Sequence, residues 1–269
     1  MEHYPRLKSG NKKMNPAVKA VRRVSPKPAP LKRRVALATG ASSGIGRAIS
    51  MALADAGASV FLVGRNVENL EATARDAQQK TDNVWICPTD LCIESEIFKL
   101  SETVAREAGQ LDILILCAGV YGGGKISETC HDVMDELYRA NVRAPLLLVQ
   151  SFLPLLRKGK GQIVFVNSSA GLHARANAGP HSAMQHALRA MADAMREELN
   201  QDGIRVLNVF PGRTATPRMK ALYARDGKTY EPGVLMQPED IARMVVQAIS
   251  LPETAEVTEI HMRPMRKSY

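Results

Sequence analysis

The chain has 269 residues, 45% of them hydrophobic and 23% charged, and a formal net charge of +9. The length suits one large α/β domain, and the composition is that of an ordinary globular protein. No uncharged apolar run reaches the 18 residues that a transmembrane helix needs, and the four cysteines have neither CxxC nor metal-ligand spacing. We therefore expect a soluble, cytoplasmic protein with no membrane contact, no bound metal and no disulfide.

The positive charge is concentrated at the amino terminus. Residues 1–34 contain 11 of the 36 Lys and Arg residues and one of the 27 acidic residues, which leaves a net charge of about −1 on the rest of the chain. Prolines at alternate positions 26, 28 and 30 exclude a regular helix there. We predict that residues 1–33 are a disordered basic extension and that residues 34–269 form the domain.

The sequence leaves the role of this extension open. A solvated tail is the simplest interpretation, and a contact with nucleic acid or another acidic surface is the alternative. Its composition, rich in Lys and Pro and poor in Ser, disfavours a transit peptide. Met14 could also be the true first residue, in which case residues 1–13 would not belong to the protein.

From residue 34 onward, apolar runs of strand length alternate with amphipathic helical stretches. In chain order, the predicted elements are strand 35–39, helix 44–56, strand 59–63, helix 67–79, strand 84–87, helix 94–108, strand 113–117, helix 131–157, strand 162–166, helix 182–200, strand 205–210, helix 238–251 and strand 257–262. This alternation predicts a single α/β domain with a doubly wound parallel sheet. Ligands of such sheets bind at the carboxyl ends of the strands.

The segment Thr39–Gly46, with the sequence TGASSGIG, lies between the first predicted strand and its helix. Its glycines allow a tight turn and a close approach of a pyrophosphate, and the helix offers free amides and its positive end to that anion. This context indicates a Rossmann-like nucleotide-binding fold. The residues that we expect to bind the cofactor here are Gly40, Ser42, Ser43, Gly44, Ile45 and Gly46.

The choice of dinucleotide depends on Arg65, at the end of the second predicted strand. A site for NAD would favour an acidic residue here to accept the ribose hydroxyls, whereas arginine offers charge and donors to a 2′-phosphate. We therefore predict NADP(H) as the cofactor, with an exposed surface arginine as the alternative. Arg47 could assist, but it lies within the helix and we expect it to be solvated.

These and later motifs, in this order and spacing, resemble the short-chain dehydrogenase/reductase family, over residues 34 to about 262. The resemblance implies further cofactor contacts after the third, fourth and sixth strands. Those residues are Asp90, Leu91, Ala118, Gly119, Pro211, Gly212, Thr214 and Thr216. The motif after the fourth strand reads Leu-Cys-Ala-Gly where the family has Asn-Asn-Ala-Gly. The Ala-Gly half implies that the backbone still approaches the cofactor, whereas the hydrogen bonds of the two asparagine side chains are lost. It also implies that Ser168 is the catalytic serine and that Asn141 holds a water for proton relay.

The chain departs from the family at two positions. The family places a proton-donating Tyr 13 residues after the serine and a Lys four residues later, whereas this chain has His181 and Gln185. Pro180 can open a helix at its first turn, which keeps the two side chains on one face. Gln185 could still hydrogen-bond a ribose hydroxyl of the cofactor, but without a charge.

Three interpretations follow from this departure. In the first, His181 replaces Tyr as the acid, since its ordinary pKa of about 6.5 suits proton donation and the positive helix end would lower it. In the second, the protein binds NADP(H) without catalysing carbonyl reduction, as a partner subunit, sensor or scaffold. In the third, another acid serves, and Tyr223, Tyr230 and His173 are the alternatives.

Family members reduce many carbonyl compounds, so the resemblance implies a small carbonyl or alcohol substrate without naming it. The loop 120–125 should border the substrate, and the polar segment 218–234 should form a lid. Its Arg218, Arg225 and Lys228 could attract an anion, although a solvated lid is the simpler interpretation. The helix 131–157 is apolar on more than one face, which favours a homodimer or homotetramer. The residues responsible are Leu146, Leu147, Leu148, Phe152, Leu155 and Leu156.

Overall fold

The computed structural model describes residues 30–266, so most of the basic extension predicted for residues 1–33 lies outside the described residues. Seven parallel strands form one sheet in the order β3-β2-β1-β4-β5-β6-β7. The strands are β1 (Val35–Thr39), β2 (Ser59–Gly64), β3 (Val84–Pro88), β4 (Ile113–Leu116), β5 (Gln162–Val166), β6 (Arg205–Pro211) and β7 (Glu259–Met262). The order reverses between β1 and β4, where a doubly wound sheet opens a crevice for its ligand.

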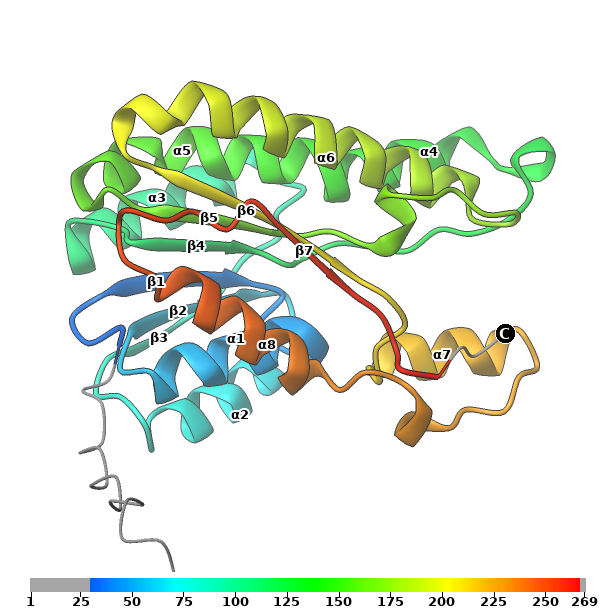
Figure 1. Cartoon of the computed structure of the whole chain (residues 1–269), viewed down its shortest axis with the longest axis horizontal. Coiled ribbons are helices and arrows are strands. Elements are labelled where there is room, and N and C mark those ends of the chain that lie inside the picture. Colours follow the sequence, from blue (N-terminus) through cyan, green and yellow to red (C-terminus); the bar gives the residue numbers. More distant parts are fainter. Residues whose placement is uncertain (1–29, 267–269) are drawn as a thin grey trace, which may run out of the picture.

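Helices cover both faces of the sheet (Figure 1). The helices are α1 (Gly44–Asp55), α2 (Val67–Ala77), α3 (Glu94–Ala108), α4 (His131–Tyr138), α5 (Ala144–Gly159), α6 (Gly179–Leu199), α7 (Pro217–Arg225) and α8 (Pro238–Ile249). In Figure 1, α1, α2 and α8 lie on one face and α3, α4, α5 and α6 on the other, while α7 extends beyond the sheet. The predicted doubly wound single domain is confirmed.

Two apolar cores result from this arrangement. Successive residues of β1 alternate between them: Ala36 and Ala38 pack toward α1 and α8, and Leu37 packs toward α3 and α5. All three side chains are fully buried. Because both faces of each central strand are covered, the strands are continuously apolar in sequence.

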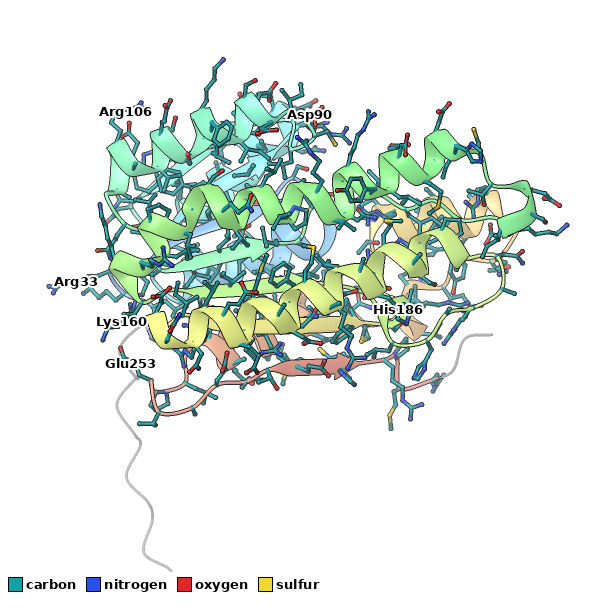
Figure 2. The ribbon with its side chains drawn as sticks, turned by 90° about the horizontal axis from the view of Figure 1, so that it is seen from above. Arg33, Asp90, Arg106, Lys160, His186 and Glu253 are labelled. Carbon is teal, nitrogen blue, oxygen red and sulfur yellow. The ribbon has the colours of Figure 1, made fainter. Side chains whose placement is uncertain are left out.

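The two ends of the sheet differ in what they carry. Figure 2 shows Arg33, Lys160 and Glu253 together at the end where the strands begin, and His186 of α6 toward the opposite end. A hollow of about 490 Å³ at the first end includes Arg34 and Asp112, whose ion pair measures 2.8 Å. This hollow contains none of the predicted site residues.

Residues just before the predicted start of the domain at residue 34 also pack on it. Leu31 is 3% exposed, and its amide donates to the carbonyl of Ala56 at 3.0 Å. The side chain packs among the apolar residues that also hold α1 in place. Residues 30–33 therefore belong to the folded domain.

The long helix predicted over residues 131–157 is interrupted. Between α4 and α5 the chain forms a π-helical turn, η2 (Arg139–Arg143), which contains Asn141. Such turns are rare and often lie at functional sites. The helix predicted to follow Pro180 is α6, with that proline in its first turn as expected.

Within residues 30–266, no helix combines the length and apolar character that crossing a bilayer requires. The four cysteines are free thiols. Burial raises the pKa of Cys87 to about 11 and that of Cys117 to about 12, which makes both poor nucleophiles at neutral pH.

Candidate functional site

A cleft of about 950 Å³ opens at the carboxyl ends of the central strands. It unites residues that follow β4, β5 and β6 with the first turns of α6 and with α7. The predicted site residues that line it are Ile45, Ala118, Gly119, Asn141, Ser168, His181, Gln185, Pro211, Gly212, Thr214 and Thr216. The others do not line it. Those are Gly40, Ser42, Ser43, Gly44, Gly46, Arg65, Asp90 and Leu91, which lie at or beyond the ends of β1, β2 and β3.

The glycine-rich loop after β1 is packed against its own backbone. A Cβ on Gly46 would collide with the carbonyl oxygen of Gly40, and one on Gly40 would lie 3.1 Å from the amide nitrogen of Ala118. Helix α1 begins after Ser43, whose side chain makes no capping hydrogen bond, and its first turn has no acidic residue. The first amides of α1 therefore have no protein side chain as acceptor, which suits an anionic ligand.

Two arginines near this loop differ in their partners. Arg47 of α1 forms an ion pair with Asp76 of α2 at 2.6 Å, so it is not simply solvated. Arg65 is exposed and forms no ion pair within the described residues. Of the two guanidinium groups, only that of Arg65 is available to a phosphate without breaking an existing pair.

Asp90 is held in a local turn. Its carboxylate accepts the amide of Cys92 at 2.9 Å, and its own amide donates to Glu96 at 2.6 Å. These bonds fix the segment that follows β3. The adenine contact implied for Asp90 and Leu91 remains a prediction.

Asn141 clamps the loop that follows β4. Its Oδ1 accepts the amide of Val120 at 2.8 Å, and its Nδ2 donates to the carbonyl of Val120 at 2.9 Å. A Cβ on Gly119 would lie 2.7 Å from this Oδ1, so only glycine fits there. The side chain thus positions the loop, and the water that the resemblance assigns to Asn141 remains a prediction.

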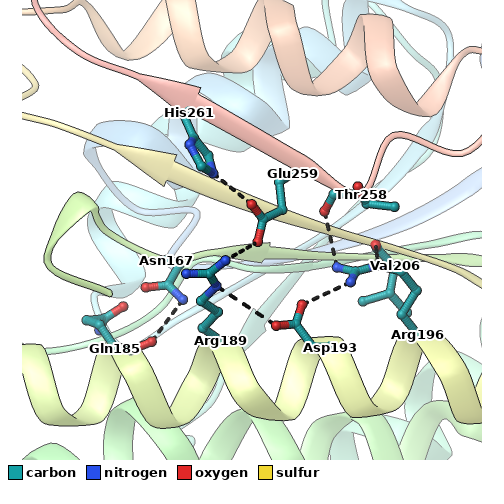
Figure 3. Close-up of polar contacts among 9 residues, drawn as sticks. All are labelled: Asn167, Gln185, Arg189, Asp193, Arg196, Val206, Thr258, Glu259 and His261. Carbon is teal, nitrogen blue, oxygen red and sulfur yellow. Dashed lines mark hydrogen bonds and ion pairs between the residues drawn. The ribbon is translucent and has the colours of Figure 1, made fainter. Parts of the chain in front are cut away.

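Ser168 lies at the end of β5, where Asn167 ties it to α6. The Oδ1 of Asn167 accepts the amide of Ser168 at 2.7 Å, and its Nδ2 donates to the carbonyl of Gln185 at 3.1 Å (Figure 3). The hydroxyl oxygen of Ser168 accepts the amide of Ala170 at 3.1 Å. The hydroxyl proton of Ser168 is thus left to face the cleft that it lines.

Three buried polar atoms on the first turns of α6 have no hydrogen-bond partner within the described residues. They are His181 Nδ1, Ser182 Oγ and Gln185 Oε1, and all three residues line the cleft. Buried polar atoms in proteins are nearly always paired, so such a cluster indicates a polar ligand. The predicted i, i+4 pair of His181 and Gln185 therefore faces a binding site.

His181 is a neutral imidazole in this site. Burial, as the larger cause, and the nearby guanidinium of Arg218 together lower its pKa to about 4. The pKa of His181 is lowered, as predicted. The causes are burial and Arg218, whereas the prediction named the positive end of the helix. At pH 7 a group with this pKa is protonated in only about 10⁻³ of the molecules.

The segment after β6 leads into α7 at the edge of the cleft. The Thr214 hydroxyl donates to the carbonyl of Gly212 at 3.1 Å, and the Thr216 hydroxyl caps α7 by accepting the amide of Met219 at 3.1 Å. Arg218 of α7 donates to the carbonyl of Gly119. This bond joins α7 to the loop that Asn141 holds, so α7 forms one wall of the cleft.

The sequence profile of the short chain dehydrogenase family matches residues 34–227. The chain belongs to the short-chain dehydrogenase family. An uncharacterized oxidoreductase of Staphylococcus aureus is 33% identical over 233 residues, which cover 86% of this chain and 97% of that protein.

Two solved structures show the same fold. A short-chain dehydrogenase of Escherichia coli complexed with NADPH is 32% identical, with a TM-score of 0.80, over 88% of this chain and 99% of that one. A metagenomic short-chain oxidoreductase in complex with NADP is 30% identical, with a TM-score of 0.76, over 88% of this chain and 100% of that one. The Rossmann-like fold predicted for this short-chain dehydrogenase is therefore confirmed.

Of the alternative acids, the structure brings only Tyr223 to the cleft of this dehydrogenase. Tyr230 packs on Tyr223 with 5.7 Å between ring centres but is outside the lining, and His173 is exposed and also outside it. The pairing of Tyr121 with His181, whose ring centres lie 4.9 Å apart, is not predicted by the sequence. The position of Tyr121 in the loop predicted to border the substrate was the only sequence signal for it.

Proposed function

We propose that this short-chain dehydrogenase interconverts a small carbonyl compound and its alcohol with NADP(H) as the cofactor. The observation that carries the proposal is the cluster of three unpartnered buried polar atoms, on His181, Ser182 and Gln185, in the same cleft as the Ser168 hydroxyl. The similar proteins crystallised with NADP or NADPH support the choice of cofactor.

The described residues near the loop after β1 fit NADP(H). The uncapped first turn of α1 would bind the pyrophosphate, and the unpaired Arg65 would bind the 2′-phosphate. Gln185 would accept a ribose hydroxyl with its unpartnered Oε1. When bound, NADPH supplies a hydride to the carbonyl carbon of the substrate.

The side chains around the reacting oxygen have separate roles in this proposal. Ser168 would orient the oxygen by donating its hydroxyl proton in a hydrogen bond, because its lone pair already accepts from Ala170. Asn141 would keep the loop after β4 in place and hold the relay water. His181 stands where the family has Tyr, and as a neutral imidazole it could donate only an N–H hydrogen bond at neutral pH.

The comparisons give no support to a protein that only binds the cofactor. The similar proteins are named as oxidoreductases, over nearly the full length of both chains. The absence of a Tyr at position 181 therefore raises the question of the proton source and does not argue against catalysis.

A homodimer or homotetramer remains part of the proposal, with less apolar surface available than the sequence suggested. Leu148, Phe152, Leu155 and Leu156 are buried within the single chain. Only Leu146 and Leu147 of the six predicted residues stay partly exposed. Light scattering of the purified protein would give the mass, and a monomer would contradict this part.

The test of the proposed function follows NADPH absorbance with a panel of ketones and aldehydes. The natural chain is compared with the double variant His181→Tyr, Gln185→Lys, and NADPH binding to both is measured by fluorescence. Turnover by the natural chain is the expected result. Turnover by the double variant alone would show a competent pocket in a naturally idle protein and would overturn the proposal.

A further inference from the structure

The proposed carbonyl reduction needs a proton for the substrate oxygen, and this inference rests on that proposed function. Two tyrosines among the described residues line the cleft, Tyr121 and Tyr223. The Tyr121 ring centre lies 4.9 Å from that of His181, with 52° between the ring planes. Tyr223 instead packs on Tyr230. The Tyr121 ring therefore packs in the cleft against the helix position where the family carries its tyrosine.

The loop after β4 is built to hold Tyr121 there. The residue before it, Val120, has both backbone polar groups bound by Asn141. A Cβ on Gly123 would lie 2.6 Å from the Tyr121 hydroxyl oxygen, and one on Gly122 would lie 3.0 Å from Leu137. The phenol thus folds back over the backbone of Gly123, and a side chain at that position would displace it.

A cation accompanies the phenol. The guanidinium carbon of Arg225 lies 5.8 Å from the centre of the Tyr121 ring. Arg225 also binds the Asp226 carboxylate at 2.8 Å. A guanidinium stabilises the negative charge that a phenol oxygen gains when it gives up its proton. Gln185 is neutral and cannot do so from α6.

We propose that Tyr121 is the proton donor for carbonyl reduction, with Arg225 as the cation that stabilises its phenolate and His181 as a positioning residue. As the carbonyl carbon gains the hydride, the Oη–H bond of Tyr121 breaks and an O–H bond forms on the former carbonyl oxygen. The phenolate then takes a proton from solvent, so each turnover consumes one hydride and one proton. Oxidation of an alcohol runs the same step in reverse.

The state of His181 agrees with this division of roles. Its neutral ring has no imidazolium proton to give at neutral pH, and its Nδ1 is buried without a partner. The ring can still pack against Tyr121 and limit the positions of the phenol. Replacement of this ring by another aromatic ring should therefore preserve much of the activity.

The central test is Tyr121→Phe, which removes only the hydroxyl. We expect kcat for reduction of cyclohexanone or 4-nitrobenzaldehyde to fall about 10²- to 10⁴-fold. NADPH affinity, measured by fluorescence, should stay within about twofold. The matched control is Tyr138→Phe, because Tyr138 is 48% exposed on α4 and outside the cleft. A Tyr121→Phe enzyme within threefold of the natural rate would overturn the proposal.

A rescue experiment separates proton donation from a structural role. In the triple variant Tyr121→Phe, His181→Tyr, Gln185→Lys, a phenol returns on α6, so reduction should recover from the level of Tyr121→Phe. Persistent loss in the triple variant, with NADPH still bound, would show that Tyr121 shapes the pocket and would overturn its role as donor. Arg225→Gln should lower kcat about tenfold without changing NADPH affinity.

The outcomes distinguish this inference from the proposed function. Reduction by the natural chain that survives Tyr121→Phe rejects the donor and leaves the proposed function standing. A natural chain that binds NADPH but is idle, beside an active His181→Tyr, Gln185→Lys variant, rejects the proposed function and the donor together. Inactivity of all these proteins with NADPH bound rejects both for this panel.

Discussion

The side chain of Asn141 satisfies both backbone polar groups of Val120, by accepting from the amide at 2.8 Å and donating to the carbonyl at 2.9 Å. Asn141 is 3% exposed and lies in the π-helical turn between α4 and α5. The irregular turn of this long helix is therefore the one that reaches the loop after β4, which borders the cleft. It couples the helix to the segment that carries Tyr121.

Asn141→Ala should destabilise the protein, because the partly buried amide and carbonyl of Val120 would lose their partners. We expect the free energy of unfolding to fall by about 1–3 kcal/mol, measured by urea denaturation. Reduction of any substrate should fall at least about tenfold as the loop loosens. The control is Asn83→Ala, since the Asn83 side chain makes an exposed contact with Ser59 at 3.4 Å. Equal effects of the two changes would contradict the clamp.

His181 should make the stability depend on pH. Its folded pKa of about 4 lies below the ordinary value of 6.5, mainly through burial, so between these values the unfolded chain binds a proton that the folded chain does not. This contribution to stability is complete above about pH 6.5 and is lost as the pH falls toward 4. Between pH 7 and pH 5 it amounts to about 2 kcal/mol.

The measurement is urea unfolding of the natural chain and of His181→Phe at pH 7 and pH 5. Between pH 7 and pH 5, the free energy of unfolding should fall by about 2 kcal/mol less in the variant than in the natural chain. His173→Gln is the control, because His173 is exposed and outside the cleft. A His181→Phe protein with the same acid sensitivity as the natural chain would contradict the neutral buried imidazole.

The elements of this fold could be predicted closely because each strand is a continuous apolar run and glycine marks the turn after β1. Leu31 was missed, because one leucine between Pro30 and Lys32 in a basic stretch carries no periodicity. Its burial comes from a contact with Ala56 that only the folded chain provides. The π-helical turn at Asn141 was also missed, since an added residue in a helical turn leaves no mark in a short apolar pattern.

The residues of the candidate site also fall into two groups. A local sequence pattern predicts one group, and only the folded chain brings the other group together. Motif residues such as Ser168 and Gln185 were predicted and lie in the cleft, because their spacing from strand ends and along one helix is local. Tyr121 meets His181 from a different element, and Arg218 lowers the His181 pKa from a third. No local pattern encodes these meetings, which depend on how the loop after β4 and helix α7 close over α6.

Arg65 should decide the preference between cofactors. Arg65→Glu would remove a guanidinium that has no ion pair among residues 30–266, and it would add a charge that repels a 2′-phosphate. We expect NADPH affinity to fall about 10- to 100-fold, with NADH affinity unchanged or higher, both measured by fluorescence titration. Arg75→Gln is the control, because the exposed Arg75 of α2 has only a weak 4.0 Å pairing with Glu71. An unchanged ratio of NADPH to NADH affinity would exclude Arg65 from the site.

Gly46→Ala tests whether the tight loop after β1 is needed for both folding and cofactor binding. The added Cβ would collide with the carbonyl oxygen of Gly40, and backbone atoms cannot move aside as a flexible side chain can. The loop would have to open, which would move the first amides of α1 away from the proposed position of the pyrophosphate. We expect Tm to fall by about 5 °C or more and the fluorescence signal of bound NADPH to disappear. Gly233→Ala is the matched control, because a Cβ there meets nothing within 4 Å. If Gly46→Ala bound NADPH as the natural chain does, the phosphate would have to be held elsewhere than at the start of α1.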